Sequence, residues 1–449
     1  MNKDGLERKL GLFSTTNIVI ANMIGTGIFT TSGLLLNIIP NPKIMVLLWL
    51  LGGTIALCGA LSYSTLGSKF PMAGGEYLYL SKLFHPILGF LSGWISLFAG
   101  FSAPISASAI GFTEYLSRAF PEILKLGILN SSMEEIFLKK FYSILIILVF
   151  TFIHLRGISF GAKVQNFLTI LKIVFIIFFI GAGFLSKRGD FSHFSTSIPL
   201  SFNLTTLKAI GLSLMWIMFS YSGWNASSYI GSEIKNPSRN IPLSLFLGTF
   251  TVSFVYFLIN LVYIYAIPPD EMKGVVSVAG LAMKKLFGDQ FELVSSILTS
   301  FVLFSSLSAF IILGPRVYYA MAKDGCFFKF ASDIHPLFKV PSNSIILQGI
   351  ISIIILISGT FEEILTYMSF SLGVFPLIAI FGIFKIRAKD KNHKIFLFPL
   401  PQLFYILFSL SILTFGFLER PIPSSVAILT IFTGIPFYFL FKRKSKACK

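Results

Sequence analysis

The chain has 449 residues, of which 55% are hydrophobic and only 12% are charged. A soluble domain of this length needs a far more charged surface, so the composition excludes an ordinary soluble protein and favours one that lies in a lipid bilayer. The net charge of +17 does not indicate a nucleic-acid partner, because Lys and Arg stand in short tracts between apolar blocks rather than on a basic soluble surface.

Apolar blocks long enough to cross a bilayer, which takes about 20 residues, recur along the whole sequence and leave no room for a separate soluble domain. They predict an all-α membrane protein, a single polytopic domain over residues 1–449 with twelve transmembrane helices. These spans are expected near residues 11–39, 43–67, 85–117, 141–155, 160–186, 205–231, 240–267, 290–322, 343–358, 361–386, 397–418 and 424–441.

The basic residues orient these spans. With the N-terminus inside, the inner segments hold about twice as many of the 36 Lys and Arg residues as the outer ones, as the positive-inside rule requires. We therefore expect a multi-pass protein of the cell membrane, inner or plasma, with both termini in the cytoplasm.

Two spans contain residues that disfavour a continuous helix. Gly25, Thr26 and Gly27 stand near the middle of the first, and the sequence FSYSGWN occupies residues 219–225 of the sixth. Small residues that let helices pack closely would explain either segment alone. Irregular backbone at membrane depth is otherwise tolerated where it lines a cavity. The two segments fall at corresponding positions of two five-span halves, which indicates the binding site of a transporter.

The chemistry of such a site follows from the backbone. A broken helix frees N–H groups at the start of one half-helix, and these suit a carboxylate. It also frees carbonyl groups at the end of the other half, and these suit an ammonium group. A zwitterion matches the pair, and no buried charged side chain is needed to hold it.

A lysine stands well inside the fifth span. Placing charged Lys172 at a helix centre costs about 2.5–3.5 kcal/mol on insertion scales. Gln165, Thr169 and Lys172 form one polar stripe, which we expect to face the interior of the bundle. The alternative is a side chain that extends to the membrane interface.

Four motifs occur in order: GTGIF at residues 25–29, FPMAGGEY at 70–77, FSYSGWN at 219–225 and EIKNPSRNIP at 233–242. At these motifs the chain resembles the amino acid–polyamine–organocation (APC) superfamily, most closely its L-type amino acid transporter (LAT) branch. The resemblance covers about the first 390 residues. It implies a leucine-transporter-type fold, in which helices 1 and 6 of two inverted five-helix repeats are broken. The repeats would span residues 11–186 and 205–386, and helices 11 and 12 would follow at 397–441.

The resemblance also implies roles for the residues at the two breaks. The substrate carboxylate would meet backbone N–H groups around Thr26 and Gly27, and the amine would meet carbonyl groups of Met23, Phe219 and Ser222. Phe219 would be the aromatic gate, and Asn225 would help to hold the broken sixth helix. The substrate-binding set is therefore Met23, Ile24, Gly25, Thr26, Gly27, Phe219, Ser222, Gly223 and Asn225.

Coupling and selectivity follow from two further positions. A Lys at the position of Lys172 replaces the sodium ion of sodium-coupled relatives, bridging helices one, five and eight, which implies sodium independence. It also leaves open a link to protons, because burial changes the proton affinity of an amine. Ser222 stands where the family often has Gly, and a side chain there favours small substrates.

The sequence thus predicts a sodium-independent amino acid transporter, an exchanger or facilitator working by alternating access on small neutral L-amino acids. A proton-coupled amino acid symporter and a cationic amino acid or polyamine antiporter remain the alternatives. No cluster for enzyme chemistry and no repeated channel filter occurs, and neither a cofactor nor a metal is expected.

Two expectations concern contacts. Residues 118–141, the outer loop after the third span, contain no Cys, so we expect no disulfide-linked heavy chain. Glu76 is expected in an inner loop, where it either pairs with a Lys or Arg to close an intracellular gate or stays solvated.

Overall fold

The computed structural model describes residues 6–124, 131–195, 203–275, 277–358, 361–390 and 395–444. Within these residues every regular element is a helix, and extended pairing is limited to two isolated bridges. One bridge joins Leu10 to Ile234, and the other joins Ala73 to Ile230. The prediction of an all-α protein is confirmed.

The helices of the first half of the chain end at Leu185. They are α1 (Leu12–Met23), α2 (Gly27–Ile38), α3 (Pro42–Lys69), α4 (Glu76–Leu83), α5 (Pro86–Ile95), the π-helix η1 (Ser96–Ser102), α6 (Ala103–Ala119), the 3₁₀-helix η2 (Pro121–Leu124), α7 (Ser131–Leu155) and α8 (Ile158–Leu185).

The second half begins after a short 3₁₀-helix, η3 (Phe191–Phe194). It contains α9 (Leu204–Ser220), the 3₁₀-helices η4 (Ala226–Tyr229) and η5 (Gly231–Glu233), α10 (Pro237–Ala266), α11 (Pro269–Met272), α12 (Val278–Phe287), α13 (Gln290–Lys323), the 3₁₀-helix η6 (Lys329–Ser332), α14 (Ser342–Ser358), α15 (Phe361–Lys389), α16 (Leu400–Glu419) and α17 (Pro421–Lys444).

Ten spans in the described part of the chain are long and apolar enough to cross a membrane. The first of them runs over α1 and α2 together, and the third runs over α5, η1 and α6. The two remaining predicted spans hold shorter apolar helices, α9 and α14. The chain is therefore a multi-pass membrane protein, while the count of twelve spans stays a prediction.

The fourth helix begins ten residues before the predicted start of its span, because α7 starts at Ser131 rather than near residue 141, and the candidate span within it begins at Met133. Charged residues in this first part had suggested a loop. Glu135 and Lys139 instead form an ion pair of 2.8 Å one turn apart, and Lys139 also contacts Glu114 of α6 at 2.8 Å. Such pairs support a helix that extends beyond the apolar core.

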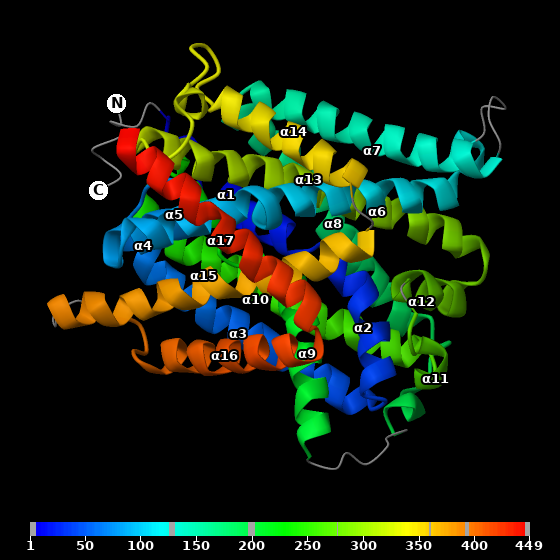
Figure 1. The fold of residues 1–449 in the computed structure, drawn as a ribbon. Helices are drawn as coiled ribbons and strands as arrows, with labels where there is room; N and C mark the ends of the chain where they lie inside the picture. The colour runs from blue at the N-terminus through cyan, green and yellow to red at the C-terminus, as the bar shows by residue number, and fades with distance from the viewer. Residues whose placement is uncertain are drawn as a thin grey trace.

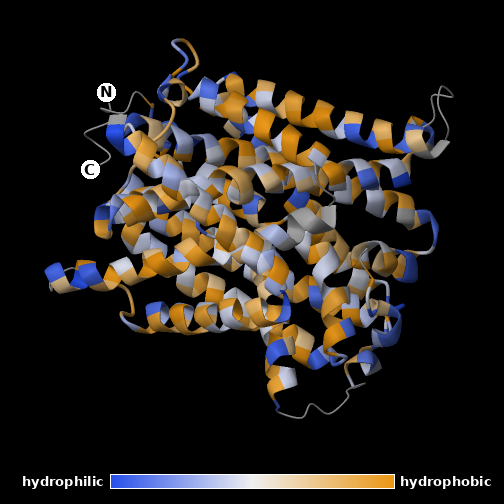
Figure 2. Cartoon of the chain, viewed as in Figure 1, coloured by the Kyte–Doolittle hydropathy of each residue, from blue (hydrophilic) through white to orange (hydrophobic). Residues whose placement is uncertain are grey.

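The helices pack in a central group with others around it (Figure 1). The α1 helix packs against α8, α10 and α13, the α2 helix packs against α9, and the α6 helix packs against α13. Peripheral helices such as α7 and α16 carry hydrophobic residues along their length (Figure 2), and Phe152 and Leu407 are exposed there. These outer faces suit contact with lipid tails, and the polar groups described below lie inside.

Candidate functional site

The first predicted break is present. The α1 helix ends at Met23 and α2 begins at Gly27, so Ile24, Gly25 and Thr26 lie outside both helices. Ile24 has an extended backbone conformation (φ −78°, ψ 96°). The backbone N–H groups of Gly25 and Thr26 make no hydrogen bond to another backbone group within the described residues.

Lys172 of α8 reaches this break. Its Nζ donates hydrogen bonds to the carbonyl oxygen of Ile24 at 2.6 Å, to that of Ala21 at 3.3 Å and to Ser306 Oγ of α13 at 3.1 Å. The Ser306 hydroxyl donates to the same Ile24 carbonyl at 2.7 Å. Because Lys172 is only 2% exposed and bonds three groups of the bundle, the prediction that it points inward is confirmed and the interfacial alternative is wrong.

A tyrosine joins the two breaks. The Tyr256 hydroxyl of α10 lies 2.8 Å from the carbonyl oxygen of Met23 and 3.0 Å from that of Ser220, the last residue of α9. Gly27 packs against Ser220 so closely that a Cβ there would lie 2.8 Å from the Ser220 Cα. The ends of α1, α2 and α9 are thereby held together at one point in the bundle.

The sixth-helix break follows Ser220. The chain turns through Tyr221 to Asn225 and then forms η4. Gly223 has φ +96°, a backbone conformation that favours glycine. A Cβ at this position would lie 2.5 Å from Asn22 Nδ2 and 2.9 Å from the Asn22 backbone carbon. Glycine is therefore needed both for the turn and for the close approach of the break to α1.

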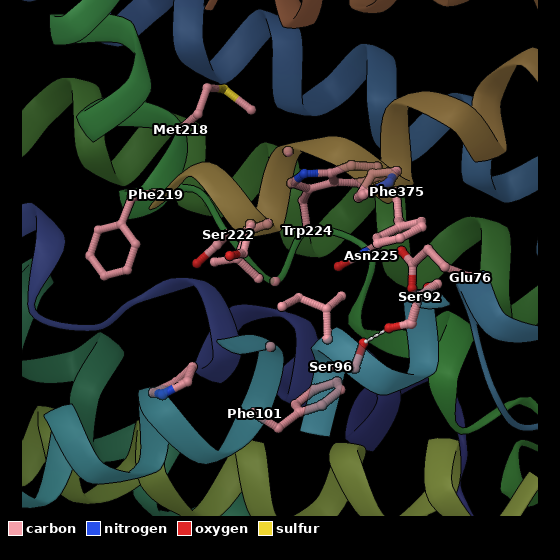
Figure 3. Close-up of a pocket in the computed structure, with 18 of the residues that line it drawn as sticks. Glu76, Ser92, Ser96, Phe101, Met218, Phe219, Ser222, Trp224, Asn225 and Phe375 are labelled. Atoms are coloured by element: carbon pink, nitrogen blue, oxygen red, sulfur yellow. Dashed lines mark hydrogen bonds between the residues drawn. The ribbon is translucent and has the colours of Figure 1, made fainter. Parts of the chain in front are cut away.

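A cavity of about 100 Å³ lies beside the sixth-helix break. A single water needs only about 10–15 Å³ measured in this way, so the space suits a small organic solute. Phe219, Ser222, Gly223 and Asn225 line it, which unites four of the predicted site residues. Figure 3 shows Phe219 and Met218 on one side of the cavity, with Glu76, Asn225 and Ser92 on the other.

The residues of the first break lie off this cavity. Met23, Ile24, Gly25, Thr26 and Gly27 are not part of its lining, and the carbonyl oxygens of Met23 and Ile24 accept hydrogen bonds from protein side chains. Their contact with substrate stays a prediction. The sequence had not separated the two breaks in this respect.

Asn22 is the residue of α1 that lines the cavity, and sequence reasoning missed it. Its Oδ1 is buried and has no hydrogen-bond partner within the described residues, while its side chain is 5% exposed. A buried polar atom without a partner is costly, so this oxygen is a ready acceptor for a ligand. An Asn two residues before the break, inside an apolar span, was the signal that could have revealed it.

The third span contributes through a local change of helix type. Ser92 of α5 and Ser96 of η1 both line the cavity, and the Ser96 hydroxyl donates to the Ser92 carbonyl at 2.8 Å. The π-helix η1 begins at Ser96, and the Tyr318 hydroxyl of α13 lies 3.3 Å from the Ser96 carbonyl. Short π-helical segments occur often at functional sites, and nothing in the sequence indicated this one.

Glu76 is buried rather than exposed at the surface, and it pairs with no basic residue within the described residues, so both expectations for it are wrong. It is 3% exposed and contributes to the cavity lining. Its Oε1 accepts hydrogen bonds from the Tyr63 hydroxyl at 2.7 Å and from Asn225 Nδ2 at 2.6 Å. Asn225 Nδ2 also donates to the Tyr229 hydroxyl at 3.0 Å. The FPMAGGEY motif thus folds back into the bundle and supports the sixth-helix break.

A buried ion pair between a glutamate and a basic residue is present, but it involves Glu233 and Arg316 instead of Glu76. Arg316 of α13 binds Glu233 of η5 through two hydrogen bonds of 2.8 and 2.9 Å, and the two side chains are 1% and 0% exposed. The Glu233 carbonyl also accepts from the backbone N–H groups of Lys9 and Leu10, both at 2.9 Å. The ion pair fixes the segment after the sixth break to α13, and the backbone contacts join it to the residues that precede α1.

No group of three or more His, Cys, Asp and Glu residues within the described part of the chain could hold a metal ion. Near the two breaks, buried charge is instead distributed over Lys172, Glu76 and the Glu233–Arg316 pair. The arrangement is a cavity beside the sixth-helix break, with donors and acceptors for a polar solute.

A comparison with known families decides the class of this protein. The model of the amino acid permease family matches residues 10–441, nearly the whole chain. The chain belongs to this family. The resemblance drawn from the four motifs is therefore confirmed, and the protein is a membrane transporter rather than an enzyme.

Individual relatives agree over nearly their full lengths. The chain is 28% identical to the b(0,+)-type amino acid transporter 1 of Mus musculus, over 97% of this chain and 88% of that protein. It is 26% identical to the Asc-type amino acid transporter 1 of Mus musculus, over 99% and 83%. It is also 26% identical to the serine/threonine exchanger SteT of Bacillus subtilis, over 98% of each chain.

Proposed function

We propose that this permease is a sodium-independent exchanger of small neutral L-amino acids that works by alternating access. The observation that carries this proposal is the cavity at the sixth-helix break, bounded by Phe219, Ser222 and Gly223 and reached by Asn22 of α1. The full-length similarity to transporters named for amino acids, one of them an exchanger of serine and threonine, supports the substrate class and the exchange mode.

The substrate would bind mostly to backbone. Its carboxylate would bind N–H groups around Thr26 and Gly27 at the start of α2, where the helix dipole favours an anion. Its amine would bind carbonyl groups at the ends of α1 and α9, with the unpartnered Asn22 Oδ1 as a further acceptor. Phe219 would cover the substrate as a gate, and Ser222 would limit the size of its side chain.

Lys172 would do the work of a bound cation. Its amine neutralises the carbonyl groups at the end of α1 and ties them to Ser306 of α13, so no sodium ion is needed at that point. Lys172 would couple substrate binding to closure of the bundle, without touching the substrate. Alternating access would also require the Glu233–Arg316 pair to open, because it holds the segment after the sixth break against α13.

The wider arrangement belongs to the same proposal. Twelve spans would form two inverted repeats, residues 11–186 and 205–386, followed by two more helices at 397–441. Both termini would face the cytoplasm from the cell membrane, and no disulfide-linked heavy chain would be needed. A proton-coupled symporter and a cationic amino acid or polyamine antiporter remain the alternatives.

The test is transport by the purified protein in liposomes. Uptake of labelled alanine, serine and threonine should rise several-fold when the lumen is loaded with the same amino acids, and replacing sodium by choline should leave it unchanged. Lysine, glutamate, phenylalanine and spermidine complete the panel of competitors. Strict sodium dependence, or competition by phenylalanine at lower concentration than by alanine, would contradict this proposal.

A further inference from the structure

Two buried carboxylates lie near the sixth-helix break, and only one of them has a counter-ion within the described residues. Glu233 is 0% exposed and forms two hydrogen bonds with the Arg316 guanidinium. Glu76 is 3% exposed, and its Oε1 accepts hydrogen bonds from two uncharged donors, Tyr63 and Asn225. An ionised carboxylate without a cation is expensive to bury, because hydrogen bonds replace only part of its hydration.

The charged groups around Glu76 bind elsewhere or are exposed. Lys385 of α15 donates to the Leu83 carbonyl at the far end of α4 and lies 4.0 Å from the Phe84 ring. Asp324 at the end of α13 accepts from Tyr77 at 2.8 Å. The titratable and charged side chains on the surrounding elements are Tyr63, Lys69, Tyr77, Tyr79, Lys82, His85, Tyr229, Arg316, Lys323, Asp324, Lys385, Arg387 and Tyr405.

Glu76 is also placed where substrate can influence it. Its side chain lines the same cavity as Ser222 and Gly223, so cavity water can reach the carboxyl. Asn225 links the sixth-helix break to Glu76 directly, since it is the last residue of the break and its Nδ2 donates to Glu76 Oε1 at 2.6 Å. Burial raises the pKa of the Glu76 carboxyl above its ordinary value, although hydrogen bonds from Tyr229, Tyr63 and Asn225 oppose the rise.

We propose that Glu76 is a proton-binding site coupled to the substrate cavity, and that it takes up a proton when a neutral amino acid binds. A proton from cavity water forms one O–H bond with a carboxylate oxygen of Glu76. It is released to water when the substrate leaves. A neutral zwitterion displaces the water that hydrates the carboxylate and brings no net charge in exchange, so binding favours the protonated form.

This inference rests on the proposed function, since it assumes that an amino acid occupies the cavity. It adds a co-transported proton and assigns it to a residue. The assignment is distinct from a proton on Lys172, whose amine bonds the carbonyl groups of Ala21 and Ile24 away from the cavity lining. Neutral substrates would then carry one proton each, and each exchanged pair would remain electrically balanced.

The experiment is calorimetric titration of the purified protein with alanine in buffers that differ in heat of ionisation. The observed enthalpy should change with buffer by an amount equal to the uptake of up to about one proton per amino acid at neutral pH. In Glu76→Gln this buffer dependence should vanish, because a neutral amide takes up no proton. In Lys172→Met it should persist.

A second variant tests the same assignment if Glu76→Gln fails to fold. Tyr63→Phe removes a donor that stabilises the carboxylate, so the pH at which proton uptake is half-maximal should rise. Buffer-independent binding by the parent protein would overturn this inference alone. So would proton uptake that survives in Glu76→Gln and is lost in Lys172→Met. A parent protein that binds no amino acid would overturn the proposed function as well.

Discussion

The two helix breaks look alike in sequence but differ in what their backbone groups meet. At the first, protein donors bind the carbonyl groups: Lys172 and Ser306 donate to Ile24, and the Tyr256 hydroxyl lies 2.8 Å from the Met23 carbonyl oxygen. At the second, Ser222 and Gly223 line an open cavity, and the supporting contact comes from Glu76 through Asn225. The first break is held by contacts with neighbouring helices, while the second break lines the cavity in which a ligand could bind.

A glycine-rich break is therefore not by itself a binding site. The freed groups must also be left without protein partners, and that depends on helices far away in the chain. Substitutions at the second break should therefore change substrate binding, whereas substitutions at the first break should change the coupling of the bundle.

The largest effect is expected at Gly223. In Gly223→Ala the alanine would have to adopt φ +96°, a strained backbone conformation for a residue with a side chain. Its Cβ would lie 2.5 Å from Asn22 Nδ2, so the break must move away from α1. Amino acid binding to the purified protein should fall by about tenfold or more, since about 1.4 kcal/mol of strain suffices for that. Gly25→Ala is the matched control, because its Cβ would meet only Ser306 Oγ at 3.8 Å. Equal losses of binding in the two variants would show that the close approach of Gly223 to Asn22 does not determine substrate affinity.

Lys172→Ala should give the next largest effect, and it should fall on transport. Removing the amine leaves the Ile24 and Ala21 carbonyl groups with fewer donors and cuts the link to Ser306 of α13. The exchange rate should drop about tenfold or more, while the equilibrium dissociation constant changes by about threefold or less.

Lys163 on the same helix is the control for this substitution, because it is exposed and its replacement by Ala should leave both measurements unchanged. Initial rates of exchange in liposomes and binding in detergent give the two quantities separately. Normal exchange by Lys172→Ala would show that the lysine does not couple the first break to the bundle.

Much of the architecture was predictable from composition, because a lipid-facing helix needs a long apolar stretch and such stretches are evident in the sequence. The start of α7 was not, since Glu135 and Lys139 pair along a helix where charged residues had suggested a loop. The breaks were predictable from Gly25, Gly27 and Gly223, whose lack of a side chain is a local property.

The side chains that bind the two breaks were predictable only where burying the residue in an apolar span is costly. A lysine in the middle of an apolar span indicates by itself that it needs a hydrogen-bonding partner, and Lys172 does donate to the Ile24 carbonyl of the first break. Glu76 and Asn225 lie 149 positions apart, and Glu233 and Arg316 lie 83 apart. Either glutamate is an ordinary loop residue until the fold brings the partner close, which is why the wrong one was considered for the ion pair.

Gly27, the first residue of α2, is an obvious position for testing the first break by a β-branched substitution. The structure makes that test ambiguous, because any Cβ at Gly27 would lie 2.8 Å from the Ser220 Cα and would push α2 from α9. A loss of binding would then report packing as well as substrate contact. Gly25 is the cleaner position.

A smaller effect is expected when the contact between the breaks is removed. Tyr256→Phe loses the hydroxyl that lies within hydrogen-bond distance of both Met23 and Ser220. A buried hydrogen bond contributes about 0.5–1.5 kcal/mol, so exchange should fall by roughly twofold to tenfold. Tyr263→Phe on the same helix is the control, because the Tyr263 hydroxyl is buried and has no partner within the described residues. Similar losses in both variants would indicate packing rather than the shared contact.

The smallest effect is expected in selectivity at the second break. Ser222 lines the cavity, and Ser222→Gly removes a hydroxymethyl group without touching the first break. Large substrates should bind more tightly than before. A methylene group in an apolar pocket is worth about 1–3 kcal/mol in discrimination, and movement of the loop can offset part of that difference. The ratio of half-inhibitory concentrations for phenylalanine and alanine should therefore fall by a few-fold. Ser213→Ala on α9, away from the cavity lining, should leave that ratio unchanged. An unaltered ratio in Ser222→Gly would mean that Phe219 or Met218 sets the size limit, and the cavity would still belong to the second break.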